Sequence, residues 1–458
     1  MKWLWSGSSE RDTAGIQPVR NQRKSPTSTI AAIARAAKSS TSRGVFWAYA
    51  LQAVSLAVSL AMLPFLTRTL GVDAYGLYAW LLNVTAYASE LVVFGATLWG
   101  AREITRRESA AERARLVYAL AVTRVALAGI TIAIWLILFS VATNDPDTLA
   151  VSVPFVLVIL ASALSQTWYF IGTQELRTPA LIAFAIRVPF VILAYSLISG
   201  PEQLVAFVWL YGGTLLLEGL IQSSMVLRRV GVPSESPLSE AVAFIKGAYP
   251  LALSSLLTVL LSGVGVTVLG VIATASETGA FSALFRIPQT ILLLFVPLMH
   301  AVYPLSCRRF KSGYYDGMRF VVRLSLGVLP VFGGALLIIC IFRDNVVSTV
   351  FGPEYAGYSY LIIGLSAWGF LTVVRNLLGE QILAASGQPG RLSFSIIAAT
   401  VITIGGSIIL VAGYGALGAS YAIIIGELSG LLVLVVFVFL KHRTESRARH
   451  SKITAPVR

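Results

Sequence analysis

Charged side chains are scarce in this chain: Asp, Glu, Lys and Arg make up only 12% of its 458 residues, whereas they make up about a quarter of a typical soluble domain. Hydrophobic residues account for 56%. A chain with so little charge cannot cover a soluble surface, which excludes an ordinary soluble domain. The composition is instead typical of a membrane protein.

Residues that bind metals or form disulfides are equally few, with two cysteines and three histidines. Cys307 and Cys340 fall on opposite sides of the predicted membrane, and no two histidines have a metal-binding spacing. We therefore expect neither a disulfide nor a metal site. No Walker-type lysine loop follows a strand pattern, which argues against ATP hydrolysis. The sequence predicts no resident cofactor and no catalytic residue.

Long polar loops are missing as well. The longest loop on the predicted outer side is "RDNVVSTVFGPEYAGY". An enzyme that builds glycans needs an extramembrane loop to hold its acid and base groups, and this chain has little room for one. The sequence therefore favours a transporter over an enzyme, with a membrane glycosyltransferase or polymerase as a less favoured alternative.

What the chain does have is a series of apolar stretches, each close to the roughly 20 residues that cross a bilayer as a helix. The alternating ten-residue strands of a membrane barrel are not seen. The fold class predicted is an all-α polytopic membrane protein with about twelve transmembrane helices. Their expected limits are 46–66, 75–100, 116–142, 150–171, 180–198, 204–227, 250–272, 280–304, 320–342, 357–379, 392–412 and 416–440.

The positive charges lie mainly on one side of this predicted membrane. Twenty-nine of the 35 Lys and Arg residues fall in the two tails and in alternate loops. Because positive loops stay in the cytoplasm, we expect both termini there. The net charge of +14 then reflects topology and attraction to anionic membrane lipids, not nucleic acid. Residues 1–45 are polar and basic, without the apolar core of a signal peptide.

A stretch of the sequence repeats faintly in the second half of the chain. "LTRTLGVDAYGLYA" contains Leu70-Gly71 and Tyr75-Gly76, and "VTVLGVIATASETGAFSA" contains Leu269-Gly270 and Gly279-Ala280-Phe281. Six spans per half predict parallel repeats about an axis along the membrane normal. The expected organisation is a cytoplasmic tail (1–45), an N-terminal six-helix bundle (46–227), a cytoplasmic linker (228–249), a C-terminal six-helix bundle (250–440) and a second cytoplasmic tail (441–458).

Seven ionisable residues fall inside the predicted spans, where one charge costs about 2.5–3.5 kcal/mol on insertion scales. We expect them to line a central cavity. For Arg124 and Arg375, snorkelling or structural pairing is an equal alternative, and Arg286 has room to snorkel outward. The glutamates are also candidate coupling sites for H⁺ or Na⁺. The seven residues are Glu90, Arg124, Arg187, Glu218, Arg286, Arg375 and Glu427.

Two of these arginines share a local pattern, "IRVP" at Arg187 and "FRIP" at Arg286. Proline cannot donate to the carbonyl four residues earlier, so each helix is expected to kink beside its cation. Arginines and glutamates together suit a cargo with an anionic group and many hydroxyls, because guanidinium pairs with phosphate. A lipid-linked sugar fits this description, whereas a cationic drug does not.

The chain resembles the polysaccharide flippases (Wzx-type, O-antigen and exopolysaccharide translocases) of the multidrug/oligosaccharidyl-lipid/polysaccharide exporter superfamily. The resemblance covers residues 44–440. It rests on Thr67-Arg68, Leu70-Gly71 and Tyr75-Gly76 in the opening repeat, and on three further stretches, "GAREITRRE", "WYFIGTQE" and "FRIPQTILLLFVPLMHAVYPLSCRRF".

The resemblance implies a V-shaped pair of bundles with a central cavity, working by alternating access in a bacterial inner membrane. The implied cargo is a polyprenyl-diphosphate-linked oligosaccharide, moved to the external leaflet for surface polysaccharide biosynthesis. Its implied partners are membrane lipids and the glycan polymerase and glycosyltransferases of the same pathway. Arg68 is expected at the external headgroups, as a phosphate contact or an outer gate. A drug/cation antiporter and a flippase for the peptidoglycan lipid precursor stay open as alternatives.

Overall fold

The computed structural model describes residues 40–143, 145–233 and 235–454. Most of the predicted N-terminal tail and the last four residues lie outside these ranges. The described residues form helices and no strand, in agreement with the predicted all-α fold. The longer helices are α2 (Ser40–Val93), α3 (Ala96–Arg106), α4 (Ala110–Ala142), α6 (Phe155–Leu164), α8 (Arg177–Leu197), α9 (Leu204–Val230), α10 (Leu238–Ile272), α11 (Ala275–Ser312), α12 (Tyr314–Ile341), α14 (Leu361–Leu378) and α15 (Pro389–Thr454).

Shorter elements complete the chain between these helices. They are α5 (Pro146–Ser152), α7 (Thr167–Gly172), η1 (Pro201–Gln203), α13 (Arg343–Val350), η2 (Pro353–Tyr358) and the π-helical turn η3 (Gly379–Ala384). Nine stretches of the described residues are long and apolar enough to cross a bilayer. Two of them, Gln52–Arg106 and Gly390–Ser446, each contain two of the predicted spans, and the predicted span 280–304 lies in α11.

Both double-length stretches bend sharply at a glycine. Gly71 in α2 has φ 75° and ψ 175°, and Gly415 in α15 has φ 52° and ψ −132°. A residue with a Cβ rarely adopts such positive φ values, whereas glycine does so at little cost. Each glycine therefore lets the chain reverse between two spans within almost continuous helix.

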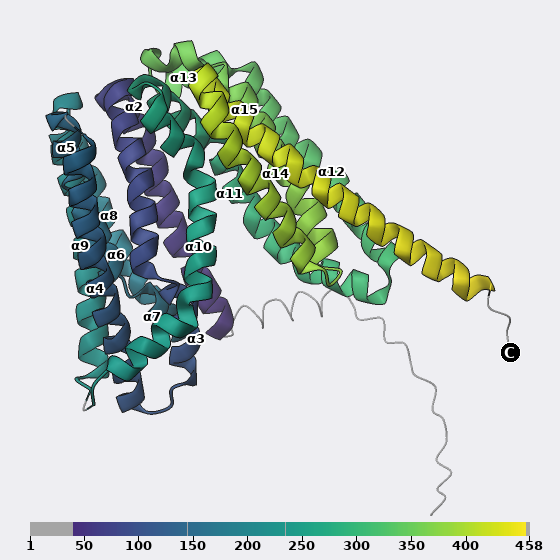
Figure 1. The fold of residues 1–458 in the computed structure, drawn as a ribbon, viewed down its shortest axis with the longest axis horizontal. Coiled ribbons are helices and arrows are strands. Elements are labelled where there is room, and N and C mark those ends of the chain that lie inside the picture. Colours follow the sequence, from purple (N-terminus) through teal and green to yellow (C-terminus); the bar gives the residue numbers. More distant parts are fainter. Residues whose placement is uncertain (1–39, 144, 234, 455–458) are drawn as a thin grey trace, which may run out of the picture.

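The helices form two bundles (Figure 1). Helices α2 to α9 make the first bundle, and α11 to α15 make the second. Helix α10 lies between them and contacts α2, α3 and α4 as well as α15. The bundles meet at the end that carries the Gly71 bend and α13, and they diverge toward the other end (Figure 1). Following the charge prediction, we call the first end the outer end and the second the inner end.

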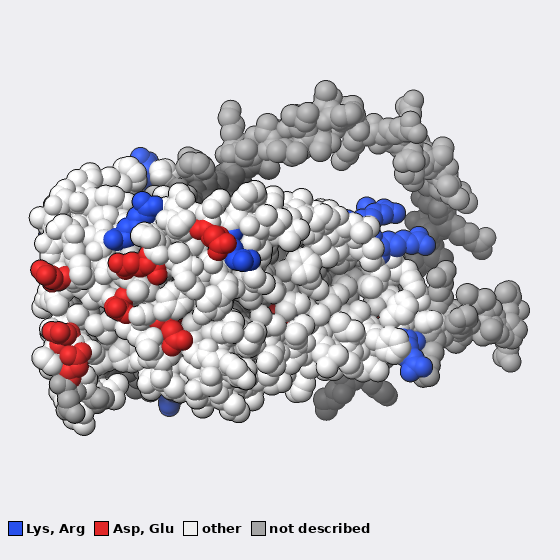
Figure 2. Space-filling model, turned by 90° about the horizontal axis from the view of Figure 1, so that it is seen from above, with Lys and Arg blue, Asp and Glu red and all other residues white. Residues whose placement is uncertain are grey.

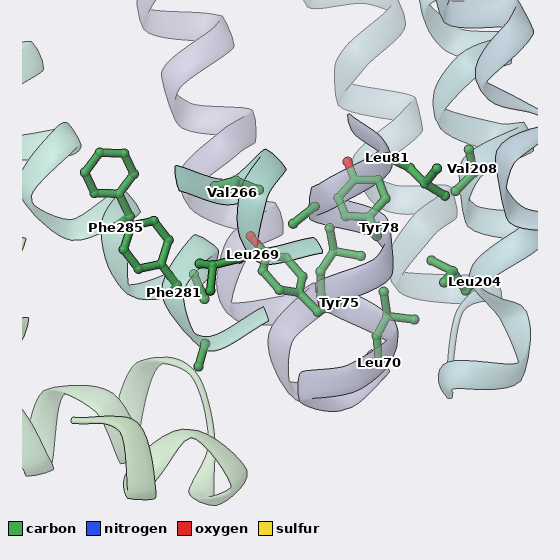
Figure 3. Packing of buried hydrophobic residues seen from close by; sticks show 14 of the residues in the cluster. Leu70, Tyr75, Tyr78, Leu81, Leu204, Val208, Val266, Leu269, Phe281 and Phe285 are labelled. Carbon is green, nitrogen blue, oxygen red and sulfur yellow. The ribbon is translucent and has the colours of Figure 1, made fainter. Parts of the chain in front are cut away.

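A hydrophobic core fills the region where the bundles meet. Figure 3 shows Leu70, Tyr75 and Tyr78 of α2 beside Leu269 of α10 and Phe281 of α11. All five side chains are at least 94% buried. This core joins α2 to both α10 and α11, so it fixes the outer end of the molecule as one packed unit.

The backbones of the two bundles come into contact where the two halves of the sequence repeat meet. A Cβ at Gly76 would lie 2.0 Å from the carbonyl oxygen of Ala275, and a Cβ at Gly279 would lie 2.1 Å from that of Val72. Real Cβ atoms do not come so near. The repeat glycines thus permit backbone-to-backbone contact between α2 and α11 at the outer end.

Candidate transport cavity

A cavity of about 650 Å³ lies between the bundles, below the core at the outer end. Four helices line it: α2 in both its halves, α8, α9 and α11. Most lining side chains are apolar or aromatic, including Leu56, Leu63, Leu66, Leu82, Phe190, Phe207 and Leu292. The cavity therefore belongs mainly to the first bundle, and α11 alone closes it from the second.

Polar lining residues follow the helical period on two walls. Gln52, Ser55 and Ser59 recur at three- and four-residue steps along α2. On α11, Gln289 and Thr290 lie three and four residues after Arg286. Residues at these spacings share one helix face, so each wall presents a polar stripe to the cavity.

Arg286 is the cation of the α11 stripe, and it is exposed to the cavity. It forms no ion pair with any carboxylate of the described residues. The Tyr75 hydroxyl lies against the Arg286 guanidinium. Tyr78 and Tyr211 lie close enough to interact electrostatically with the same guanidinium. Because guanidinium and phenol groups both donate hydrogen bonds, this corner of the cavity is suited to an anion.

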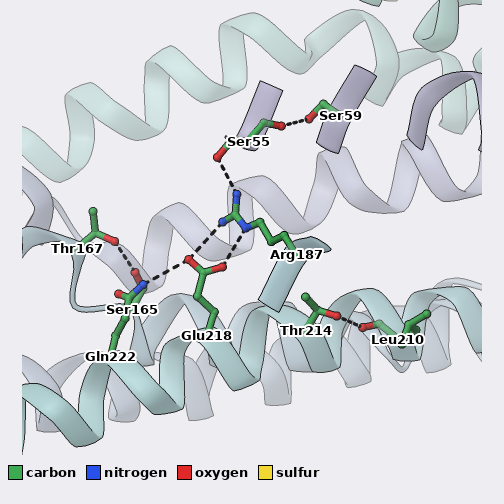
Figure 4. Close-up of polar contacts among 9 residues, drawn as sticks. All are labelled: Ser55, Ser59, Ser165, Thr167, Arg187, Leu210, Thr214, Glu218 and Gln222. Atoms are coloured by element: carbon green, nitrogen blue, oxygen red, sulfur yellow. Dashed lines mark hydrogen bonds and ion pairs between the residues drawn. The ribbon is translucent and has the colours of Figure 1, made fainter. Parts of the chain in front are cut away.

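Arg187, in contrast, is already paired (Figure 4). Its Nε and Nη2 atoms donate to the two carboxylate oxygens of Glu218, at 3.0 and 3.3 Å, and Nη1 donates to the Ser55 hydroxyl at 2.7 Å. Such a bidentate pair satisfies the guanidinium geometry fully. The pair lies behind the cavity wall, and Ser55 connects it to the polar stripe of α2.

The Arg187–Glu218 pair continues into a hydrogen-bonded chain within the first bundle. The Gln222 side-chain amide donates to Glu218 at 3.3 Å, and its side-chain carbonyl accepts from the backbone N–H of Gln166 at 3.0 Å. The Gln166 side chain in turn accepts from Trp168 and donates to Ser223. This chain links the cavity wall to the interruption between α6 and α7.

Arg375 and Glu427 form the corresponding ion pair in the second bundle, between α14 and α15. The side chains are 23% and 9% exposed. Neither residue lines the cavity. The pair therefore connects two helices of one bundle.

Arg124 also stays within one bundle. Its side chain is 2% exposed and donates to the backbone carbonyls of Ser162 and Ser165 at the end of α6. Carbonyls at a helix C-terminus have no partner in the helix and attract cations. Arg124 thus caps α6 from α4, and it is not among the residues lining the cavity.

Glu90 and Arg68 lie at different interfaces. Glu90 faces the Ser255 hydroxyl between α2 and α10. Arg68 donates to the carbonyls of Thr349 and Val350 at the end of α13. Arg68 therefore links the first bundle to the second at the outer end, beside the Gly71 bend.

Further polar contacts cross between the bundles at the outer end. The backbone N–H of Val72 donates to Glu354 at 3.1 Å, and Ser276 donates to Asp73. Burial raises the pKa of Tyr355 far above its ordinary value, so its phenol stays protonated beside the Gly71 carbonyl. We call these contacts, together with the Gly76–Gly279 crossing, the outer seal.

The outer face of the molecule is markedly acidic. Figure 2 looks onto this end, and Asp and Glu side chains gather on it. Three of them, Asp73, Glu277 and Glu354, belong to residues around the outer seal. The asymmetry between this end and the basic loops at the other matches the charge distribution expected of a membrane protein.

The structure places Arg286 in the cavity wall and the Arg187–Glu218 pair behind that wall, joined to it through Ser55, and it places Arg124, Arg375, Glu427, Glu90 and Arg68 elsewhere. Sequence reasoning missed Tyr75, Tyr78 and Tyr211, because aromatic residues in membrane spans are common and carry no distinctive spacing. It also missed Gln52 and Gln289. The helical spacing of polar residues around Ser55 and Arg286 is the signal that identifies them.

Comparisons with known proteins agree with this architecture. The family model described as "Polysaccharide biosynthesis protein" matches residues 41–310, more than half of the chain. A curated protein of Escherichia coli (strain K12), named "Putative O-antigen transporter", is 21% identical over 80% of this chain and 89% of its own length. A Haloferax volcanii protein, named "Probable low-salt glycan biosynthesis flippase Agl15", is 25% identical over 35% of this chain and 34% of its own.

Among solved structures, the chain is similar to an inward-facing multidrug resistance transporter of the MATE family, a member of the MOP superfamily. The TM-score is 0.59 at 15% sequence identity, covering 87% of this chain and 96% of that one. At this identity the likeness concerns the fold. It supports a polytopic helical fold for the described residues.

Proposed function

The chain belongs to the polysaccharide biosynthesis protein family, and from this premise we propose that it is a flippase. Its cargo is a polyprenyl-diphosphate-linked oligosaccharide, which it moves from the cytoplasmic to the external leaflet for surface polysaccharide biosynthesis. The names of its relatives, an O-antigen transporter and a glycan biosynthesis flippase, support this role. The chain is a transporter rather than an enzyme.

The observation that carries the proposal is the unpaired Arg286 in the cavity. A free guanidinium within a membrane is expensive, and no carboxylate among the described residues compensates it. The diphosphate of the cargo would supply that compensation through charge-assisted hydrogen bonds. The Tyr75 hydroxyl beside Arg286 adds a further donor.

The cavity also lowers the cost of moving a glycan. A hydroxyl that enters hydrocarbon without a partner costs several kcal/mol, so an oligosaccharide would face a barrier of tens of kcal/mol. The polar stripes of α2 and α11 offer partners for these hydroxyls. The polyprenyl chain itself is apolar and remains in the lipid.

We further propose alternating access between two states. In the state described here, the outer seal is closed and the bundles diverge toward the inner end (Figure 1). Opening toward the outside requires that α2 separate from α11 and α13. The acidic side chains around the seal would then repel the diphosphate and favour its release.

The test is transport of a fluorescent lipid-linked oligosaccharide by the purified protein in liposomes. Wild-type protein should move the lipid between leaflets, and Arg286→Ala should lower the rate about tenfold or more, since it removes a charge-assisted contact of about 1.5–3 kcal/mol. Arg124→Lys is a matched control, because that arginine lies outside the cavity. Equal rates for Arg286→Ala and wild type would reject the assignment.

Energy coupling is a separate part of the proposal. Glu90 and Glu218 are the candidate sites for H⁺ or Na⁺ in this proposal, because a carboxylate inside a membrane protein marks ion pathways, whereas Glu427 pairs with Arg375 away from the cavity. Transport should fall when the gradient of the coupling ion is collapsed. Transport that persists without either gradient would remove the coupling role.

The peptidoglycan lipid precursor is the second candidate cargo, because it offers the same diphosphate to Arg286. Competition in the liposome assay separates the two: excess precursor should not slow transport of the surface-polysaccharide lipid. The proposed location is the bacterial inner membrane with both termini in the cytoplasm, which reporter fusions at each end would test. Co-purification would test association with the glycan polymerase and glycosyltransferases.

A further inference from the structure

Two glutamines on different helices line the cavity and have no hydrogen-bond partner among the described residues. Gln52 lies on the polar stripe of α2 and Gln289 on that of α11. Neither side-chain amide forms a hydrogen bond within the described part of the chain. The other glutamines of the bundle interiors behave differently: Gln166, Gln222 and Gln381 are all at most 2% exposed and hydrogen-bonded.

Both amides are open to the cavity: Gln52 is exposed and Gln289 is half-buried. Apolar residues such as Leu56, Leu63 and Leu292 line the same walls, so the packing of these walls does not require an amide at either position. The amides of Gln52 and Gln289 are therefore available to a group that enters the cavity.

The chemistry of an amide defines what that ligand is. A glutamine side chain carries two N–H donors and a carbonyl acceptor and no charge. It matches a hydroxyl group, which also donates and accepts, better than it matches an anion or a cation. Two such amides in one cavity match the hydroxyls of a neutral, polyhydroxylated ring.

The position of Gln289 relates this ring to the anion. Gln289 follows Arg286 by three residues and lies on the same face of α11. Three residues of helix rise about 4.5 Å. A group held by Gln289 thus lies directly beside a group held by Arg286, toward the inner end.

We propose that Gln52 and Gln289 form a sugar subsite, which binds the hydroxyls of the sugar attached to the diphosphate. This inference rests on the proposed function and deepens it. Arg286 holds the charge common to every such lipid, and the two glutamines distinguish the first sugar. Selectivity among glycans then arises at the amides, not at the guanidinium.

The experiment compares two lipids that differ only in the sugar. One is a short polyprenyl diphosphate carrying a single hexose, and the other carries a methyl group in place of the hexose, so both have the same diphosphate diester. Their affinities are measured by competition on the purified full-length protein in lipid nanodiscs. Wild-type protein should bind the hexose lipid about tenfold more tightly, as expected for one to two net hydrogen bonds.

The variant Gln52→Leu/Gln289→Leu should lose this tenfold preference and still bind the methyl lipid as wild type does. Leu293→Ala removes volume from the same face of α11, one turn further on, without removing a polar group. It should leave the preference intact. Gln289→Asn, which retains an amide, should keep part of the preference for the hexose lipid.

Three results overturn the subsite. They are equal wild-type affinity for the two lipids, an equal loss for both lipids in the double leucine variant, and a preference that survives in that variant. Failure of the proposed function looks different. In that case wild-type protein binds neither lipid, or Arg286→Ala binds both as tightly as wild type does.

Discussion

The two bundles each bury one Arg–Glu pair, but the pairs differ in what surrounds them. In the first bundle, Ser55 connects Arg187 to the polar stripe of α2, and Gln222 holds Glu218 from behind. In the second bundle, Arg375 and Glu427 join α14 to α15 away from the cavity. The same ionic chemistry therefore supports a cavity wall in one bundle and a helix contact in the other.

The bundles also share a device at their inner ends. Gln166 lies where the chain breaks between α6 and α7, and Gln381 lies in the π-helical turn after α14. Each buried amide binds groups of its own bundle: Gln166 accepts from Trp168 and donates to Ser223, and Gln381 donates to the Met299 carbonyl of α11 and accepts from Ser306. The two buried glutamines thus connect helices within each bundle, and neither lines the cavity.

The largest predicted effect concerns the glycines at the crossing of the bundles. Gly76→Val or Gly279→Val introduces a Cβ about 2 Å from a backbone oxygen of the other bundle, so the outer seal cannot close. We expect each variant to abolish surface polysaccharide in a strain that depends on this chain, at normal membrane levels of protein.

Matched controls exist in both bundles for this prediction. A Cβ at Gly213 or at Gly334 would meet no atom within 4 Å. Gly213→Val and Gly334→Val should therefore support normal polysaccharide. If either seal variant exported as well as its control, the seal would not be part of the transport cycle.

The next largest effect is on the stability of the second bundle. Arg375→Leu leaves Glu427 buried without its partner, which typically costs 3–5 kcal/mol. Arg375→Leu/Glu427→Leu removes both charges and should recover most of that loss. The measurement is the free energy of unfolding, from denaturant titration in detergent. A double variant no more stable than the single one would show that the pair does more than join α14 to α15.

The third prediction compares the effects of the two Arg–Glu pairs on the transport rate. Arg187→Leu/Glu218→Leu should fold, because it too removes both charges, but it releases Ser55 and leaves the cavity wall without its ionic group. We expect its transport rate in liposomes to fall about tenfold, the loss of roughly one charge-assisted hydrogen bond. The Arg375→Leu/Glu427→Leu variant should transport at nearly the wild-type rate. Equal transport rates for the two double variants would show that the two pairs do not differ in their role in transport.

The helical fold and the membrane spans could be predicted from the sequence because both follow from local composition. It also identified the charged residues, since each one stands out in an apolar stretch. It did not reveal which of them pair: Arg187 and Arg286 have the same "RVP"-like context, yet one meets Glu218 and the other faces the cavity. Pairing depends on how helices far apart in sequence rotate and pack against each other. Local periodicity does not determine that packing.

The smallest predicted effect tests a contact between the bundles rather than within one. Arg68 of α2 donates to two carbonyls at the end of α13 and is exposed, so it should contribute about 1 kcal/mol or less to the closed outer seal. Arg68→Met should then shift the closed-to-open ratio by up to about fivefold.

That shift is measurable as the rate of disulfide formation between cysteines at Asp73 and Ser276, whose side chains touch only when the seal is closed. Arg343→Met is the matched control, because this half-buried arginine pairs with its neighbour Asp344 inside the second bundle. Arg68→Met should slow cross-linking, and Arg343→Met should not. Equal rates would mean that the glycine crossing and the core beneath it hold the bundles together without help from Arg68.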